Sequence, residues 1–221
     1  MKWNRKVEEL LSKMTLEEKI GQTSQRGTSS MAKELPESLI EAVRKGRVGS
    51  AINVTHRDLK DQLQRIAVEE SPNGIPILFG RDVIHGYKTI FPIPLGQAAT
   101  WNPAMVKEGS RIAAAEATTN GIKWTFAPMI DISRDPRWGR IAESAGEDTH
   151  LTSVMSVAYV EGFQGNDLAK PSSLVACAKH FAAYGAVEGG RDYNTSSVPE
   201  HLLREIYLPP FKAALDAGVA T

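Results

Sequence analysis

The 221-residue sequence has little cysteine, no excess of either charge and no long apolar run. Its single cysteine, Cys177, excludes an intrachain disulfide, and its apolar surroundings predict an inert core thiol rather than a nucleophile. The 26 basic and 26 acidic residues cancel. This balance favours neither a nucleic-acid partner nor an anionic membrane surface. No apolar segment reaches the roughly 18 residues that cross a bilayer.

Motifs of several site classes are missing as well. There is no Walker-type or dinucleotide-type glycine loop and no His-Glu-x-x-His pattern, and the five histidines are scattered. We therefore expect no cofactor and no metal site, and a barrel enzyme for phosphorylated substrates is disfavoured. The N-terminus lacks an apolar signal-peptide core, which predicts a cytoplasmic protein. A secreted or periplasmic protein whose signal peptide has been removed would show the same pattern.

Short apolar runs alternate with segments of helical periodicity. The runs at residues 49–54, 75–79, 124–130 and 174–178 predict strands, and residues 219–221 the start of another. Helical periodicity predicts helices at residues 4–14, 103–120, 149–164 and 199–217. Three further helices are expected from one end only: one starts at Thr15 with a Thr15–Glu18 capping box, one ends at Gly46, and one starts at residue 55. Strands alternating with helices indicate a parallel sheet. Since a complete (β/α)8 barrel takes about 250 residues, the predicted class is α/β. We expect a partial TIM-type barrel, about its first half, ending in a strand stub, with residues 1–221 as one incomplete domain.

Four local expectations follow from turn and cap chemistry. Thr55 is predicted to cap a helix, and the polar residues 22–30 are predicted to form a loop. The prolines in residues 91–96 predict a stiff connection without helix. Pro209 and Pro210 are expected to interrupt the last helix, which then resumes at Phe211.

Charged residues follow three of the predicted strands. Asp82 lies in Gly80-Arg81-Asp82-Val83-Ile84-His85-Gly86, four charged residues lie in Arg134-Asp135-Pro136-Arg137-Trp138-Gly139-Arg140, and a Lys-His pair lies in Cys177-Ala178-Lys179-His180-Phe181. Charges just beyond the carboxyl ends of buried strands predict a site on the loop face of an α/β barrel.

These charges also have purely structural interpretations. Asp82 could pair with Arg81 or cap a turn, and some charges of the arginine-rich loop are expected to form ion pairs because buried guanidinium groups are costly unless paired. Neighbours on a strand point to opposite faces, so Lys179 and His180 reach one ligand only where the chain turns sharply. Aromatic residues such as Trp138 are expected in the core rather than stacked on a sugar.

Taken together and in order, the motifs resemble the N-terminal barrel domain of glycoside hydrolase family three, which contains many β-glucosidases. The resemblance rests on Leu11-Ser12-Lys13-Met14-Thr15-Leu16-Glu17-Glu18-Lys19-Ile20-Gly21-Gln22, Gly80 to Gly86, Phe91-Pro92, Phe126-Ala127-Pro128, Asp135 to Arg140 with Glu143-Ser144, Gly146-Glu147-Asp148, Lys179-His180-Phe181 and Pro209-Pro210-Phe211-Lys212.

The resemblance implies a subsite for the terminal, non-reducing sugar of a β-glucoside or gluco-oligosaccharide. Its residues would be Asp82, Arg140, Lys179 and His180, with Asp192 resembling an acidic residue that orients the lysine. The residue types suit this ligand. A carboxylate can accept from two hydroxyls of a neutral sugar, while lysine and arginine supply charged donors.

In the family, the nucleophile is an aspartate on a later barrel strand and the acid/base is a glutamate in a second domain. Neither segment is present, so we expect no catalytic residue in this chain and no turnover by it alone. Unpaired sheet edges predict self-association or a complementing second part. Residues 182–190 lack the histidine of the family's nucleosaminidase branch, which favours a glucosidase-like or xylosidase-like specificity. The alternative is a non-catalytic carbohydrate-binding module or an engineered half-barrel scaffold.

Overall fold

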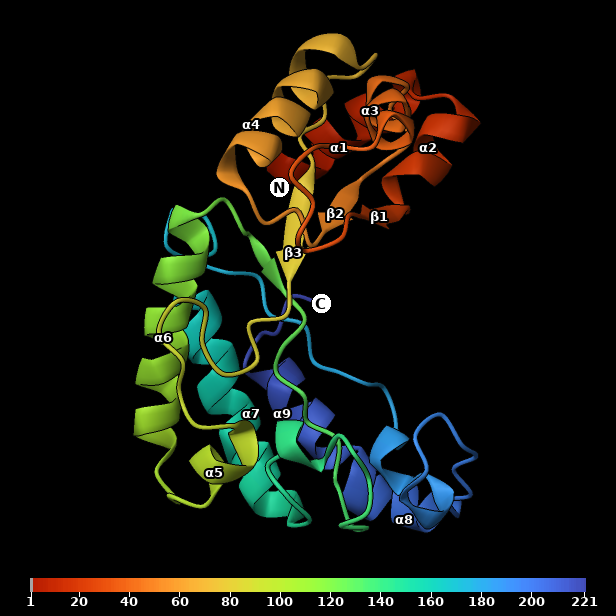
Figure 1. Ribbon diagram of the computed structural model, residues 1–221. Helices are drawn as coiled ribbons and strands as arrows, with labels where there is room; N and C mark the ends of the chain where they lie inside the picture. The colour runs from red at the N-terminus through yellow and green to blue at the C-terminus, as the bar shows by residue number, and fades with distance from the viewer. Residues whose placement is uncertain (1) are drawn as a thin grey trace. The chain divides into compact units, whose positions relative to one another are not determined.

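The computed structural model describes residues 2–221, with side chains from residue 5 onward, and divides after Arg81 into two compact units. In the first unit, three short parallel strands lie in the order β1, β2, β3 (Figure 1). Ala51 at the centre of the sheet is fully buried and lies in register with Arg26 and Phe79. The elements of this unit are α1 (Lys2–Lys13), α2 (Leu16–Gln22), β1 (Gln25–Gly27), α3 (Glu37–Arg44), β2 (Ser50–Ile52), α4 (Arg57–Arg65), the π-helical turn η1 (Ile66–Glu70) and β3 (Leu78–Arg81).

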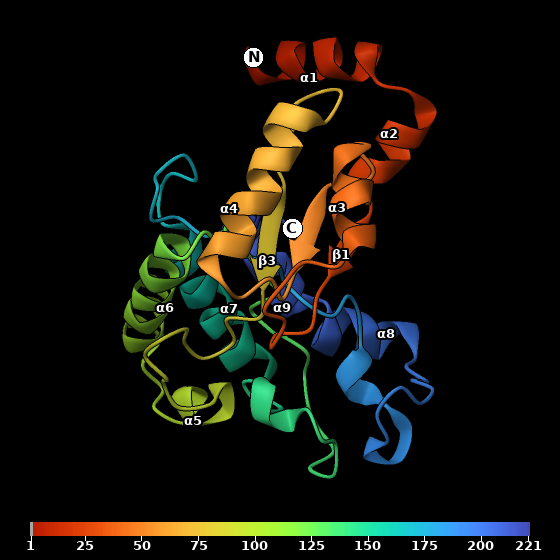
Figure 2. The same ribbon diagram turned by 45° about the horizontal axis from the view of Figure 1, so that its top comes forward.

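The second unit is dominated by helices. The long helices α6 and α7 lie side by side in both views, and α9 packs against α7 (Figures 1 and 2). Its elements are α5 (Pro94–Ala98), α6 (Pro103–Thr119), β4 (Trp124–Thr125), η2 (Ile141–Glu143), α7 (Thr149–Gln164), η3 (Tyr184–Ala186), η4 (Glu188–Gly190), α8 (Glu200–Leu202), η5 (Leu203–Tyr207) and α9 (Pro209–Asp216). Among the described residues, no helix has the length and apolarity needed to span a membrane.

Local capping signals in the sequence are confirmed. The Thr15 side chain accepts from the backbone N–H of Glu18, and the Glu18 carboxylate accepts from the backbone N–H of Thr15, which completes the predicted capping box. Gly46 has a φ of +65°, and the N–H of Arg47 reaches back to the carbonyl of Ala42. Such a left-handed residue terminates a helix at little cost only when it is glycine.

The predicted strands at 124–130 and 174–178 pair with each other, but the pairing is discontinuous. β4 covers only two residues, and the parallel pairing with the second segment continues through single bridges at Trp124 with Val175 and Met129 with Lys179. Pro128 lies within the segment, and a proline has no N–H to donate to a ladder. Thr221 pairs with the same segment, since its N–H donates to Ala176 at 3.2 Å. The predicted strand stub therefore joins this pairing.

Several boundaries and connections differ from the sequence-based expectations. The strand expected at 75–79 is β3, three residues further along, and β2 is shorter than residues 49–54. The predicted loop 22–30 contains β1, whose three residues are all exposed. An edge strand that is exposed on both faces has no alternation to reveal it.

Three expectations about caps and prolines were wrong. Thr55 does not cap α4, which begins at Arg57, because the Thr55 hydroxyl donates instead to the carbonyl of Ser30 at 2.9 Å. Residues 91–96 are not free of helix, since α5 begins at Pro94, and α9 resumes at Pro209 rather than two residues later. Proline fits the first helical position because the N–H it lacks would have no partner there.

The contact between α6 and α7 depends on small residues. Ala113, Ala114 and Ala117 of α6 are almost completely buried. On α7, a Cβ added to Gly162 would lie 2.4 Å from the carbonyl oxygen of Lys107 and 2.6 Å from Cβ of Ser110. The two helices therefore approach as closely as they do only because this position has no side chain.

We predict that Gly162→Ala destabilises the protein by about 1 to 3 kcal/mol, because relieving the overlap must move one backbone against another. The gain in helix propensity, about 1 kcal/mol, is smaller. Gly109→Ala in α6 is the matched control, since its Cβ would make only ordinary contacts of 3.8 Å with Phe91. Urea unfolding followed by circular dichroism measures both variants. A Gly162 variant as stable as the control would contradict the close-packing account.

Candidate functional site

The first pair of predicted site residues meets directly. Nζ of Lys179 lies 2.7 Å from Oδ1 of Asp82. The lysine side chain is 13% exposed and the aspartate side chain 50% exposed, so the pair has a buried cation and an accessible carboxylate. The ion pair that Asp82 forms is therefore with Lys179 and not with Arg81, which was the structural alternative. An accessible carboxylate beside a fixed ammonium can accept from one hydroxyl-bearing ligand while the lysine donates to it.

His180 binds a residue that the sequence did not single out. Its ring nitrogen Nδ1 lies 2.8 Å from Oδ2 of Asp131, and its backbone N–H donates to the same oxygen at 2.9 Å. The peptide bond between Lys179 and His180 is cis. The chain leaves the strand pairing at this point, and the two neighbouring side chains reach Asp82 and Asp131 respectively. A bend at His180 follows the bridge at Lys179, which is the turn that the two side chains need if they are to reach one ligand.

Arg140 forms a two-pronged ion pair with Glu143. Its Nε and one terminal nitrogen donate to the two carboxylate oxygens at 2.7 and 2.8 Å, and its guanidinium lies 5.6 Å from the ring centre of Tyr184. The Glu143 hydrogen bonds raise the pKa of Arg140. Burial alone would raise the pKa of Glu143, but the hydrogen bonds and charge of Arg140, together with the charge of Lys179, lower it overall. Glu143 is therefore an ionised carboxylate among three positive or protonatable groups.

Asp192 lies on the same network but not where the sequence placed it. Its Oδ1 accepts from the indole N–H of Trp138 at 2.9 Å and from the hydroxyl of Tyr184. Both bonds lower the pKa of Asp192, and the bond from Tyr184 has the larger effect. The expectation that Asp192 orients Lys179 is corrected, because among the described contacts the lysine pairs with Asp82. Asp192 instead fixes two aromatic side chains.

Tyr184 connects the parts of the site. Its ring packs edge-on against the rings of His180, at 5.0 Å, and Trp138, at 5.2 Å, and lies under the Arg140 guanidinium. Trp138 is 1% exposed and contacts the buried Val187, so it is a core residue as expected. The five predicted residues thus belong to one cluster with three further members: Asp131, Glu143 and Tyr184.

Sequence reasoning missed those three for different reasons. Asp131 follows a strand in the same way as Asp82, so that signal was available but not used. Glu143 was noted only as part of a motif, although its three-residue spacing from Arg140 suits an ion pair. Tyr184 lies in an irregular loop, where nothing in the sequence indicates which neighbour it contacts.

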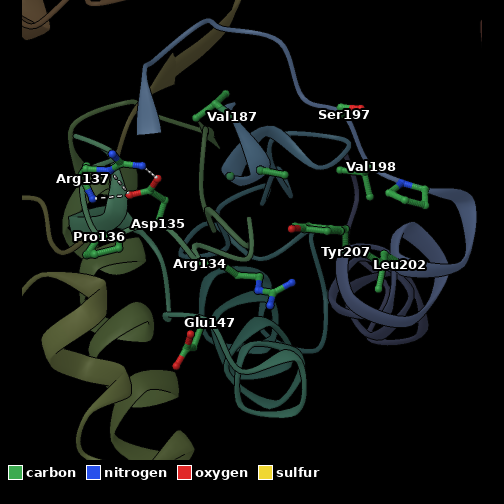
Figure 3. A pocket seen from close by; sticks show the side chains of 13 residues that line it. Arg134, Asp135, Pro136, Arg137, Glu147, Val187, Ser197, Val198, Leu202 and Tyr207 are labelled. Carbon is green, nitrogen blue, oxygen red and sulfur yellow. Dashed lines mark hydrogen bonds and ion pairs between the residues drawn. The ribbon is translucent and has the colours of Figure 1, made fainter. Parts of the chain in front are cut away.

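A separate pocket of about 670 Å³ lies beside this cluster in the second unit, and none of the five predicted residues lines it. Figure 3 shows the Asp135–Arg137 ion pair on one wall and Leu202 with Tyr207 on the other. The hydrogen bonds from Arg137 lower the pKa of Asp135 to about 2. The expected ion pairing within the arginine-rich loop is therefore confirmed for Arg137 and, through Glu143, for Arg140.

Comparison with known proteins decides the family. The model of the glycosyl hydrolase family 3 N-terminal domain matches residues 15–221. The chain belongs to this family. It is 46% identical to a periplasmic β-glucosidase of Salmonella typhimurium and 31% identical to a β-xylosidase of Formosa agariphila, over 96% and 99% of its length. A β-glucosidase structure from Listeria innocua superposes with a TM-score of 0.89 and 40% identity over 97% of the chain.

These relatives are much longer than the chain, which covers 28% of the Salmonella protein, 26% of the Formosa protein and 31% of the Listeria structure. The predicted α/β class with a partial TIM-type barrel is confirmed by this family assignment and by the structural likeness. Cys177, predicted to be a core thiol, is only half-buried.

The two arginine–carboxylate pairs of this family 3 domain make a testable contrast. We predict that Arg140→Met raises the pKa of Glu143 above its ordinary value, because burial then outweighs the remaining attractive charges. In the wild type, the lowered pKa makes the pair stabilising above the unfolded-state pKa, and this stabilisation is lost as pH falls through the folded-state pKa. Carboxyl NMR titration measures the change.

The matched control is Arg137→Met, which should raise the pKa of Asp135 from about 2 and leave Glu143 unchanged. Each arginine should thus affect only its own carboxylate. An unshifted Glu143 in the Arg140 variant, or equal shifts of both carboxylates in either variant, would show that the ion pairs do not set these pKa values.

Proposed function

We propose that the chain is the N-terminal, sugar-binding part of a retaining β-glucosidase that hydrolyses terminal non-reducing β-D-glucosyl residues. The observation that carries this proposal is the cluster formed by the Asp82–Lys179, Arg140–Glu143 and Asp131–His180 pairs. It combines fixed cationic donors with one accessible carboxylate acceptor, Asp82, which suits the hydroxyls of a neutral sugar because each of them is both donor and acceptor. Listeria innocua β-glucosidase has been solved with glucose, isofagomine and gluconolactone, and a mutant of it with laminaribiose, which supports a sugar ligand.

In this proposal, Asp82 accepts hydrogen bonds from sugar hydroxyls, while Lys179 and Arg140 donate to sugar oxygens. Pairing with Glu143 and Asp82 keeps both cations in place before the sugar arrives, so less side-chain freedom is lost on binding. His180 contributes its second ring nitrogen, and Asp192 keeps Tyr184 and Trp138 in position beside it. None of these groups attacks the glycosidic bond.

Hydrolysis with retention requires two carboxylates about 5 to 5.5 Å apart across the scissile bond, one as nucleophile and one as acid/base. We assign neither role to a residue of this chain. The missing roles belong, in this proposal, to a later barrel strand and a second domain, and the complete protein would cleave the bond through a glycosyl-enzyme intermediate.

Glucose and xylose are both candidate sugars, because the relatives include a β-xylosidase as well as β-glucosidases. The compartment, cytoplasmic or else secreted or periplasmic with a signal peptide removed, stays a prediction.

The test combines turnover with binding. The purified chain should not hydrolyse an aryl β-D-glucoside, while the Salmonella relative serves as positive control. The chain should nevertheless bind D-glucose weakly, as seen by shifts of assigned amide signals in an NMR titration. Turnover by the chain alone would contradict the assignment of the catalytic groups to other segments.

Substitutions locate the sugar. Asp82→Asn and Lys179→Met should each weaken glucose binding by about tenfold, the effect of one lost hydrogen bond to a charged group. Asp135→Asn, which breaks an ion pair outside the cluster, is the control and should bind as the wild type does. Wild-type affinity in both cluster variants would show that the sugar binds elsewhere or not at all.

We further propose that the chain associates through open sheet edges, with itself or with the remaining part of a barrel. Within the described first unit, β1 pairs with β2 alone, and its three residues are exposed. An uncovered strand edge presents free N–H and C=O groups to another chain. We expect light scattering to give a mass that rises with protein concentration. A mass of one chain at all concentrations would contradict this proposal.

A further inference from the structure

Asp131 is a buried carboxylate whose described contacts all go to one residue. Its side chain is fully buried, and Oδ2 accepts both from the backbone N–H of His180 and from the ring nitrogen Nδ1. Its other oxygen, Oδ1, has no partner among the described residues. Burying a carboxylate with an unsatisfied oxygen is costly. An apolar side chain would fill this position at lower cost than a carboxylate, so the His180 contact is where the role of Asp131 lies.

The two bonds to Oδ2 determine where the ring proton is. A backbone N–H can only donate, so Oδ2 is an acceptor in the bond of 2.9 Å. With Oδ2 accepting, the bond of 2.8 Å requires a proton on Nδ1 of His180. In a neutral imidazole one nitrogen donates and the other accepts, so Nε2 is left as an acceptor.

The free end of the ring belongs to the proposed sugar site. The His180 side chain is 31% exposed, and its ring is held edge-on by Tyr184. Lys179 and Arg140 carry no acceptor, and both oxygens of Glu143 are engaged by Arg140. A neutral acceptor nitrogen therefore supplies what the cations beside it cannot, an acceptor for a sugar hydroxyl proton.

We propose that Asp131 is a positioning residue that holds His180 in its Nδ1–H form and presents Nε2 as a hydrogen-bond acceptor to a sugar hydroxyl. Asp131 itself does not touch the sugar. The sugar part rests on the proposed function, whereas the tautomer part stands on the geometry of this unit alone. The comparable arrangement in hydrolases is the buried aspartate that sets the tautomer of a catalytic histidine.

The first measurement is nitrogen NMR of the histidine rings at neutral pH, with the His180 signals assigned from a His180→Gln variant. The wild type should show a proton on Nδ1 and none on Nε2. Asp131→Ala should move the proton toward Nε2. Asp131→Asn, which keeps the shape of the side chain, should do so in part because a neutral amide accepts more weakly than a carboxylate. If circular dichroism shows that the alanine variant is unfolded, the tautomer of His180 in the asparagine variant tests the proposal.

His85 is an internal control in the same spectra. Its Nδ1 lies 2.9 Å from the carbonyl oxygen of Phe91, which can only accept, so His85 should keep its Nδ1–H form in every variant. A wild-type His180 protonated on Nε2, or a His180 tautomer unchanged in both Asp131 variants, would overturn the proposal.

The second measurement separates positioning from general stability. Asp131→Ala should weaken D-glucose binding by about tenfold in the wild-type background. It should have no further effect in the His180→Gln background, because a residue that acts through His180 has nothing left to act on. Equal losses in both backgrounds would reduce Asp131 to a structural residue and overturn the positioning role. If the wild type binds no glucose while the tautomer follows Asp131, the proposed function fails and the control of His180 by Asp131 stands.

Discussion

The parallel pairing of residues 124–130 with 175–179 is the constraint on which the site depends. The N–H of Lys179 donates to Pro128 at 3.1 Å, and the N–H of Ile130 donates to Lys179 at 2.9 Å. Asp131 and His180 follow the two paired segments directly, and they lie close enough for the His180 N–H to donate to the Asp131 carboxylate. A shift of the pairing by one residue would turn every side chain to the opposite face and separate the two. The backbone therefore decides which carboxylate the histidine meets.

Paired charges make the resulting cluster tolerable inside the protein. Each cation has a carboxylate at hydrogen-bonding distance, Lys179 with Asp82 and Arg140 with Glu143. Such pairs add little net stability when compared with apolar residues of the same shape, since desolvation offsets most of the attraction. What they provide is fixed geometry, which is the property that the proposed sugar site needs.

The packed helices of the second unit give rigid support to the charged cluster. α6 and α7 approach closely at Gly162, where an added Cβ would overlap the α6 backbone, and this packing leaves little room for relative movement. α7 in turn packs on α9, where the Ser156 hydroxyl donates to the carbonyl of Pro210 at 3.3 Å. A loop site held by well-packed helices keeps its residues in place better than loops alone would.

The sequence by itself determined the α/β class, the family and most helix ends, because caps such as Thr15 and Gly46 act within one turn and are read locally. It also predicted Asp82, Arg140, Lys179 and His180 as site residues, since their positions after buried strands and within motifs are features of the chain. Only the tertiary structure decided their partners. Asp131 meets His180 across 49 positions, and Asp192 meets Trp138 across 54. Such contacts depend on strand register and loop path, and neither is encoded in the spacing of neighbouring residues.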